Sequence, residues 1–497
     1  MVILMSIFKR FICVCLCVLL VVGCFTGCAD KYMEAIIYFE LLEQPHTLDP
    51  QTAQSDSELL IVRNIYEGLM REQTSGEIVA GVAESYSYEN MTYTFNLRDD
   101  AKWSNGDKVT AYDFEYGFRR ALDPKIKAPF AHRLFSIAGA EAIASGNADV
   151  STLGVKAVDD TTFQITMCRE DADFLKTLTT SVCMPCNKAF FEESVGKYGL
   201  EVECTVSNGS YRITKWNKED FGIRLYRNES YSGGFSAQNA AVFISCVEDE
   251  SQISRLNGEE SDMAFISGSE VGAASKNDLS IEKVQNICWV MTISRNFSPE
   301  IRKSFAMAFS SDVYKNSLPT SFNTAKSIYP QILGVNAEGI GITEYDAQQA
   351  KGIMLEQVSL LPDGKFPSST LYYYDADGVK GLATAIVGHW QQNFGTFINI
   401  EASDNINALK SEIGESDLDF ALFPITARSK IFSEYASNFA AISTMQTPDE
   451  LQREILDTHI VIPVAYQSTD VCFIPTLENV VLHDDNGYID FSCIIKR

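Results

Sequence analysis

The stretch TYTFNLRDDAKWSNG, residues 92–106, decides the fold class because a strand pattern runs directly into a tight turn. Every second residue from Tyr93 to Leu97 is apolar, so these side chains share one face of a strand. Residues 84–90 alternate in a similar way, which predicts a hairpin-like pair of strands. Asn105-Gly106 then predicts a turn, since both residues tolerate the backbone angles that tight turns require.

A helix is predicted directly after this turn. Thr110 to Asp113 is typical of a helix N-terminus, because hydroxyl and carboxylate oxygens there accept hydrogen bonds from free backbone N–H groups. Its apolar stripe comprises Phe114, Phe118, Ala121 and Leu122. On the other side of the opening stretch, Ala35–Glu40 predicts a strand, 44–50 a proline-punctuated loop and Ser57–Met70 a helix.

The pattern changes from Pro299 onwards. Strand-like segments precede it, at 162–167, 211–214 and 223–226, and helical spacing follows at 301–309 and 347–355. Residues 371–374, 383–393 and 397–402 then read strand, helix, strand, which predicts a βαβ unit and an α/β lobe. The segment 460–465 returns to a strand pattern.

The composition is that of a globular protein. Hydrophobic residues make up 46% and charged residues 21% of the 497 residues, a length that predicts two or three domains. The formal net charge of −26 argues against nucleic acid or acidic lipid as a partner, because both are polyanions.

The N-terminus resembles a bacterial lipoprotein signal over residues 1–23. Lys9 and Arg10 precede an apolar run, 11–22, that is shorter than the roughly twenty residues needed to span a bilayer. Val21-Val22-Gly23-Cys24 resembles a lipobox, which implies cleavage before Cys24 and two acyl chains on its sulfur. Cys28 is the alternative acylation site, and an uncleaved helical anchor is the alternative to both. We expect the protein on the outer face of the bacterial cytoplasmic membrane, lipid-anchored.

Cysteine and histidine give little support to an enzyme or a metal site. Cys183-Met-Pro-Cys186 has redox spacing but no thioredoxin-like context, and no second pair completes a zinc site. The five histidines are isolated, and no Gly-x-Ser-x-Gly or phosphate loop is present. We therefore expect no catalysis, no cofactor and no bound metal. The sequence leaves open whether one or two disulfides form and which cysteines they would join.

The opening stretch also resembles a known signature. With its flanks it is similar to the solute-binding proteins of oligopeptide ABC transporters, bacterial extracellular solute-binding protein family 5. The resemblance rests on the segments 81–86, 93–106, 109–114 and 119–124, on 48–50, 64–69, 208–211 with Trp216 and 257–258 with Asp262, and more weakly on 301–302, 389–390 and 462–463.

This resemblance implies an α/β, two-lobed periplasmic-binding-protein-like fold with the ligand cleft between the lobes. The resemblance implies the larger class of this fold, in which the first lobe carries an extra subdomain, here at about 50–170. The first lobe would comprise 24–288 plus 461–497, and the second lobe 289–460. The signature itself, with Trp103 and Asp113, would be scaffold and not binding site.

Two ligand-binding positions in the first lobe follow from the resemblance. Leu41-Leu42-Glu43 matches a place where relatives lay peptide backbone against their own, as an added strand. Glu43 would face the ligand, or alternatively be a solvated loop carboxylate. Pro129-Phe130 matches a pocket aromatic that is usually tyrosine, so Phe130 would keep the apolar contact without the hydroxyl.

The second lobe departs from its relatives after Asp419. Relatives carry a Trp-rich stretch there, with an Asp that pairs with the amino terminus of the peptide. Counting along this chain places Ile425 at the position of the relatives' Trp and Arg428 at the position of their Asp. Between this point and Ile460 the chain is also shorter than its relatives. Either the alignment slips or the pocket has changed charge. A cleft-facing Arg428 would suit a carboxylate or phosphate, while the alternative is a solvent-exposed loop.

Three hypotheses for function follow. The first is an extracytoplasmic, monomeric binding lipoprotein that delivers peptides to the permease subunits of an ABC transporter. The second is an interaction or sensing lipoprotein that keeps the fold with an altered pocket. The third is binding of another solute, such as an oligosaccharide or a metal chelate.

Overall fold

The structure of the protein is a computed structural model that describes residues 34–41, 43–219, 222–246, 251–257, 259–310, 312–335, 342–442, 447–483 and 488–497. The predicted signal peptide, Cys24 and Cys28 lie outside the described residues. No helix within the described part of the chain is long and apolar enough to cross a membrane.

One large mixed sheet runs through the molecule. Its eleven strands follow the order β15-β14-β16-β12-β17-β11-β1-β10-β9-β8, with β13 paired to β17. They are β1 (Ile36–Leu41), β8 (Tyr211–Asn217), β9 (Gly222–Arg227), β10 (Ala241–Cys246), β11 (Met263–Ile266), β12 (Ser280–Ile293), β13 (Phe322–Thr324), β14 (Ser369–Tyr374), β15 (Ile398–Ser403), β16 (Phe420–Thr426) and β17 (Val461–Phe473).

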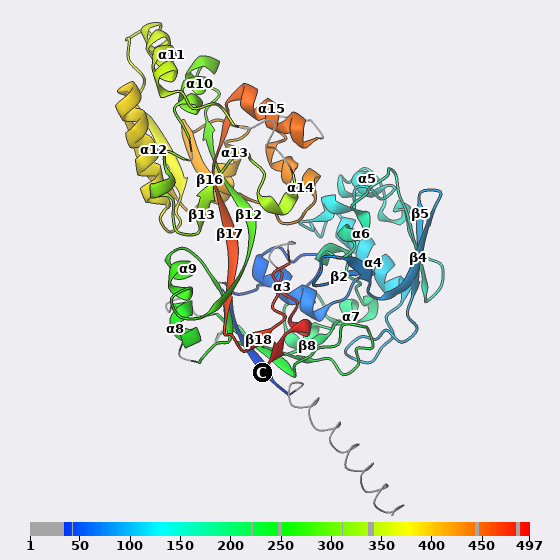
Figure 1. Cartoon of the computed structure of the whole chain (residues 1–497). Helices are drawn as coiled ribbons and strands as arrows, with labels where there is room; N and C mark the ends of the chain where they lie inside the picture. Colours follow the sequence, from blue (N-terminus) through cyan, green and yellow to red (C-terminus); the bar gives the residue numbers. More distant parts are fainter. Residues whose placement is uncertain are drawn as a thin grey trace, which may run out of the picture.

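The long strands β12 and β17 connect two bodies (Figure 1). They pair antiparallel from Ser280 opposite Phe473 to Thr292 opposite Val461. We call the body with β1 and β8–β11 the first lobe, and the body with β14–β16 the second lobe. The lobe limits expected after 288 and 460 fall inside β12 and directly before β17.

The second lobe is a sheet with helices on both faces. On one face, buried side chains of β16 pack with α10 (Pro299–Met307), α11 (Ala347–Ser359) and α12 (Val379–Phe394). On the other face they pack with α13 (Ile406–Ser411), α14 (Phe432–Ala436) and α15 (Pro448–Thr458). Phe420 and Leu422 face one layer and Ala421 and Phe423 the other, because successive strand side chains point to opposite faces. The predicted βαβ unit is confirmed, since β14 and β15 pair parallel around α12.

A separate four-stranded sheet lies in the first lobe. It has the order β4 (Ala83–Glu89), β5 (Thr92–Leu97), β7 (Thr162–Thr166), β6 (Val155–Ala157). The predicted hairpin is confirmed, with Asn90 and Met91 at positive φ in its turn. Phe95 and Phe163 are fully buried there together with Phe114 of α4 (Ala111–Leu122). Trp103 is also fully buried, and its indole donates to Asp113 at 3.3 Å.

Shorter elements complete the fold. They are α3 (Asp56–Ile65), α5 (Ala140–Ala144), α6 (Phe174–Thr177), α7 (Lys188–Glu193), α8 (Gln252–Asn257), α9 (Ser269–Ala274), β2 (Met70–Glu72), β3 (Ile78–Ala80), β18 (Leu477–Glu478), β19 (Ile495–Lys496), and the 3-10 helices η1 (Ala131–Leu134), η2 (Val150–Thr152), η3 (Ser181–Cys183), η4 (Val202–Cys204), η5 (Lys315–Ser317), η6 (Gln331–Leu333), η7 (Ser437–Phe439) and η8 (Phe491–Cys493).

The helix predicted over Ser57–Met70 is wrong at its C-terminal end, because α3 ends at Ile65. The amide of Asn208 accepts a hydrogen bond from the N–H of Glu67 at 3.0 Å and donates to its carbonyl at 2.8 Å. A side chain distant in sequence thus forms hydrogen bonds with backbone groups that a longer helix would pair within itself. Helical periodicity in the sequence does not reveal such a contact.

Two buried charged groups hold the loop between β1 and α3. Glu58 is 3% exposed, and its carboxylate accepts hydrogen bonds from backbone N–H groups on both sides of the loop, including those of His46 and Gln54. Asp49 pairs with Arg120 of α4, whose Nη1 also donates to Gln51 at 2.7 Å. The loop is therefore fixed at both ends, and it presents the start of α3 in one orientation.

Replacing Arg120 tests this anchoring. We expect Arg120→Met to lower the free energy of unfolding by about 3–5 kcal/mol, because it leaves the buried Asp49 carboxylate without its cation. Urea unfolding followed by circular dichroism measures this. Lys197→Met is the control, since Lys197 pairs with Glu201 on the exposed surface, and we expect its midpoint to stay unchanged. Equal midpoints for both variants would contradict the anchoring role.

Candidate functional site

Parallel strands of both lobes end at the same part of β17. Ile266, at the carboxyl end of β11, lies opposite Asp470. Thr426, at the carboxyl end of β16, lies opposite Ile287 of β12, which pairs with Gln467 of β17. β11 runs parallel to β1, and β16 runs parallel to β14. Because ligands of open α/β sheets bind outside the carboxyl ends of the strands, a binding site is expected here.

A cavity of about 410 Å³ occupies this place. Its volume falls in the range of roughly 300–1,000 Å³ that is usual for small-ligand sites. Both apolar and polar side chains line it: Glu43, Asp56, Ser57, Phe265, Ile266, Ser267, Ile287, Gln467, Ser468, Thr469 and Asp470. The cavity thus lies where β1, α3 and β11 meet the two connecting strands.

Three carboxylates lie on the first-lobe and β17 side of the cavity. Glu43 follows β1 and Asp56 begins α3, and both side chains are exposed to the cavity. Glu43 was predicted as a ligand-facing residue, and the structure places it on the cavity wall. Neither Glu43 nor Asp56 forms an ion pair or hydrogen bond with another residue of the described part of the chain.

The environments of Asp56 and Asp470 disfavour the charged carboxylate. Partial removal from water raises the pKa of Asp56, and the charge of Arg428 opposes this rise. Asp470 is 2% exposed, and burial raises its pKa although Ser468 Oγ donates to both carboxylate oxygens at 3.0 and 3.1 Å and Lys283 lies nearby. A cation that entered the cavity near either group would favour its charged form.

Two basic side chains of the second lobe, both outside the cavity lining, lie near the start of α3 or near each other. Arg428 follows β16, is half-buried, and donates from Nη1 to the carbonyl of Gln54 in the first lobe at 2.9 Å. It therefore reaches across to the loop in front of Asp56. Burial and the charge of Arg428 lower the pKa of Lys410 on α13.

Sequence reasoning missed Asp56, Asp470 and Lys410. Asp56 follows Ser55, the N-cap residue of α3, and such a position usually indicates a helix start and nothing more. Asp470 reaches the cavity through the pairing of β17, whereas Lys410 of α13 lies outside the cavity lining. No local signal in the sequence distinguishes these residues from other surface charges.

Three predicted site residues, Arg428, Ile425 and Phe130, lie outside the lining of the cavity. Ile425 is fully buried and pairs opposite Cys288, so the expectation that it lines the pocket is corrected: its side chain belongs to the core between β16 and its covering helices. Phe130 is 7% exposed, and its ring lies 4.6 Å from the guanidinium of Arg133. Phe130 thus supports a contact between the lobes.

That contact is an ion pair between η1 and α14. Arg133 Nη2 lies 2.8 Å from Glu434 Oε1, and the two side chains are 3% and 14% exposed. Ser429 Oγ donates to the other carboxylate oxygen at 2.8 Å. Burial alone would raise the pKa of Glu434, but Arg133 and Ser429 outweigh it and hold this pKa below its usual value. The pair therefore contributes more when Glu434 is charged.

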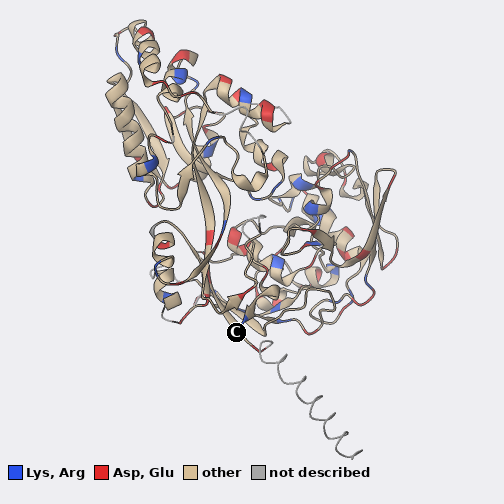
Figure 2. Ribbon diagram, in the orientation of Figure 1, with Lys and Arg blue, Asp and Glu red and all other residues tan. Residues whose placement is uncertain are grey.

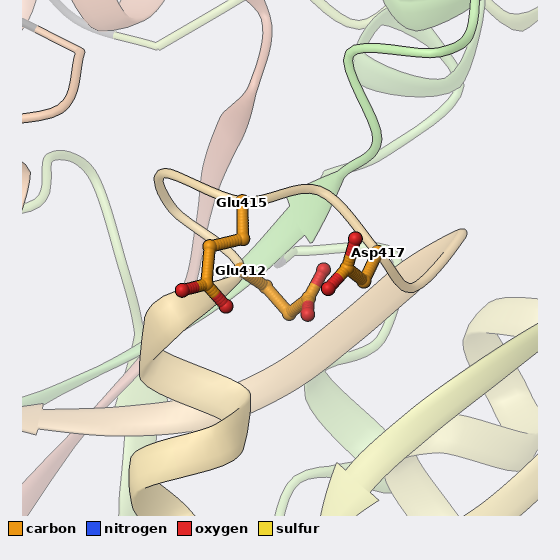
Figure 3. Close-up of side chains that lie close together, drawn as sticks. All are labelled: Glu412, Glu415 and Asp417. Carbon is orange, nitrogen blue, oxygen red and sulfur yellow. The ribbon is translucent and has the colours of Figure 1, made fainter.

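Three other carboxylates lie together in the second lobe, away from the cavity. Figure 3 shows Glu412 and Asp417 pointing toward each other with Glu415 beside them, and all three lie close enough to share a metal ion. Glu412 is buried and accepts a hydrogen bond from the N–H of Leu418 at 2.8 Å, while Glu415 and Asp417 are exposed. We interpret this cluster as structural, with Glu412 stabilising the loop before β16.

The Cys183-x-x-Cys186 pair has no redox character here. Both thiols are free and buried, and burial raises the pKa of each to about 12. A protonated thiol is a poor nucleophile, which favours the structural interpretation. All eight cysteines of the described residues are free.

Similarity to known proteins covers most of the chain. A family model described as "Bacterial extracellular solute-binding proteins, family 5 Middle" matches residues 77–443, more than half of the sequence. The chain belongs to this family. Its members are binding proteins of transporters and not enzymes.

Among curated relatives, the oligopeptide-binding protein OppA of Bacillus subtilis is 27% identical over 400 residues, which is 76% of this chain and 72% of that protein. The substrate-binding domain of an oligopeptide ABC transporter from Bacillus anthracis has a TM-score of 0.75 at 23% identity, over 94% of this chain and 100% of that one. Listeria monocytogenes OppA bound to peptide has a TM-score of 0.72 at 19% identity, over 93% of this chain and 99% of that one. These structures confirm the predicted two-lobed fold.

The interlobe ion pair predicts a pH-dependent stability. A carboxyl with a lowered pKa contributes stability above its unfolded pKa of about 4.3, and this contribution is lost as the pH falls through the folded value. We expect Glu434→Gln to destabilise the protein at pH 7 by about 1–3 kcal/mol. Urea unfolding at pH 7 and below pH 4 measures the difference between variant and wild type, which should shrink in acid.

Glu192→Gln is the matched control, because Glu192 pairs with Lys188 on the exposed surface of α7. It should change neither the free energy of unfolding nor its dependence on pH. A cost of Glu434→Gln that stays constant from pH 7 into acid would contradict the role of the charged pair.

Proposed function

We propose that the chain is an extracytoplasmic lipoprotein that binds peptides for uptake by an ABC transporter. The cavity carries this proposal, because it lies where β1, α3 and β11 meet the connecting strands β12 and β17, and Arg428 of the second lobe reaches the loop beside it. The printed names of relatives agree: an oligopeptide-binding protein in Bacillus subtilis and a dipeptide-binding protein in Lactococcus lactis. Its direct partners would be the peptide and the permease subunits, with the protein acting as a monomer.

Binding would be coupled to closure of the lobes. We place the first lobe at 24–288 plus 461–497, with the extra subdomain at about 50–170, and the second lobe at 289–460. A ligand that contacts both lobes has a higher affinity for the closed state, so it shifts the population toward closure. The change would be concentrated where β12 and β17 cross between the lobes.

Glu43 and Arg428 remain our proposed ligand-binding residues; Glu43 lines the cavity, and Arg428 lies outside the lining, against the loop before α3. Glu43 lies on its wall two residues after the end of β1, at the place where the resemblance implies that relatives lay peptide backbone against their own. Arg428 reaches the loop before Asp56. Phe130 would act by supporting Arg133 in the contact between the lobes.

One observation favours a second function. By counting along the chain, Arg428 falls where the resemblance implies an acidic partner for the amino terminus of the peptide, unless the alignment slips there, so a sensing or interaction role with an altered pocket needs a test. Co-purification separates the two functions. A transport protein should be retained by detergent-solubilised permease subunits encoded beside it, and a sensing lipoprotein should not.

The peptide assignment predicts ligand-induced stabilisation. A ligand that binds the native state alone stabilises it by about 2.7 kcal/mol at a hundred times its dissociation constant. The purified protein should therefore melt at a higher temperature with mixtures of di- to pentapeptides, measured by differential scanning fluorimetry. Peptides without effect, together with a shift from oligosaccharides or metal chelates, would contradict the assignment.

The anchor predicts membrane association through one cysteine. In a bacterial host, Cys24→Ser should move the protein from the membrane to the soluble extracytoplasmic fraction, because the diacylated sulfur is lost. Cys28→Ser is the matched control and should leave the protein in the membrane fraction. If the Cys28→Ser variant became soluble and the Cys24→Ser variant stayed in the membrane fraction, Cys28 would be the acylated residue. Membrane retention of the double variant would contradict lipid anchoring.

A further inference from the structure

The charged side chains that line the cavity all have the same sign. Within the described part of the chain they are Glu43, Asp56 and Asp470, and no lysine, arginine or histidine is among the lining residues. In Figure 2, acidic segments are visible at the start of α3 and on β17. Like charges gathered in one cavity create a negative potential there, which attracts cationic groups and repels anionic ones.

Apolar side chains lie beside these carboxylates. Phe265 on β11 and Ile287 on β12 line the cavity, and both are partly exposed. Ile266 belongs to the same lining and lies opposite Asp470 across β11 and β17. The cavity of about 410 Å³ thus combines an apolar surface with an acidic one. A ligand group that matches both surfaces has an apolar stem and a positive charge at its tip.

The acidic surface is not neutralised from within. Among the described residues, Glu43, Asp56 and Asp470 form no ion pair with a lysine or arginine. Burial raises the pKa of Asp470 although the charge of Lys283 opposes the rise, and it raises the pKa of Asp56 although Arg428 opposes it. Carboxylates that are partly removed from water without a cation in contact are costly, and a bound cation relieves that cost.

A metal ion does not fit the acidic surface. Glu43, Asp56 and Asp470 are not among the carboxylates of the described residues that lie close enough together to share one ion. They are instead spread along the cavity, from the residues after β1 to the start of α3 and to β17. A longer organic cation fits this spacing better than a single ion does.

Lysine and arginine side chains have the composition that this lining requires. Each has a chain of methylene groups that packs on apolar surface and a cation that needs polar or charged partners. An ammonium group has three N–H donors and a guanidinium has five, so either can bind more than one carboxylate oxygen. A glutamate or aspartate side chain of a ligand would be repelled by the same surface.

We propose that the cavity selects basic peptides, by binding the cation of a lysine or arginine side chain at Glu43 and Asp56. The methylene groups of that side chain contact Phe265 and Ile287. Asp470, which is 2% exposed, adds negative potential from the wall of the cavity. The selection rests on the peptide-binding function proposed above, and it concerns a side chain of the ligand and not the two ends of the peptide.

The test compares tripeptides that differ in one side chain only. In a background of alanine with both ends free, one position is lysine, arginine, norleucine or glutamate, and the series is repeated for each of the three positions. Norleucine keeps the methylene groups of lysine and lacks its charge. Isothermal titration calorimetry on the full mature protein gives the dissociation constants.

For the wild type, we expect norleucine to bind about 10-fold more weakly than lysine at the position that lysine prefers, the lower end of the range for hydrogen bonds to charged groups. Arginine should bind about as tightly as lysine, and glutamate more weakly than norleucine. Because all the peptides have the same two free ends, the charge of the ends cancels from these ratios.

Variants assign the preference to the cavity. Asp56→Asn should reduce the ratio of the norleucine and lysine dissociation constants to a few-fold at most and leave the norleucine constant close to its wild-type value. Glu43→Gln provides a second variant on the same surface, in case Asp56→Asn fails to fold. Because each result is a ratio between ligands on one variant, a loss of stability does not imitate it.

Asp363→Asn is the matched control, because it makes the same change at an exposed carboxylate in the loop after α11, outside the cavity lining. It should keep the wild-type ratio. Equal binding of lysine, norleucine and glutamate peptides would overturn the selection and leave the peptide function standing. A lysine preference that both cavity variants retain would overturn the assignment to this cavity. No binding by any tripeptide would overturn the peptide function and the selection together.

Discussion

The antiparallel pairing of β12 with β17 is the constraint on which the rest of the structure depends. These two strands belong to both lobes, and through them a single sheet runs from β15 to β8. Their register shifts between Gln285 and Ile287 and again between Trp289 and Val290. Such irregularities bend a strand and increase its local twist. Because the two lobes are closely packed, we expect bending to occur where the strands cross between them.

The same pairing creates the site. Register along β17 brings the end of β11 and the end of β16 to neighbouring positions, and the cavity opens there. The loop before α3 is fixed by Glu58 and by the pairing of Asp49 with Arg120, and it delivers Asp56 to one wall. Rigid lobes with fixed charges and a joint between them suit a protein that recognises a ligand by closing on it.

Local patterns in the sequence predicted the hairpin around Asn90 and the βαβ unit of the second lobe, because alternation and helical spacing are short-range properties. The cavity was harder to predict. Asp56, at the start of α3, and Asp470, on β17, line the same cavity although they are far apart in the sequence. Ile425 was misplaced because counting along a strand does not reveal which face is buried; its side chain shares a face with Phe423 in the core.

Small-angle X-ray scattering on the purified mature protein tests the central claim, that the lobes close on a ligand held between them. With a saturating tripeptide mixture, the radius of gyration should fall relative to the ligand-free protein. A radius that stays constant while free peptides demonstrably bind would contradict the account, because the ligand would then lie in a site that does not join the two lobes.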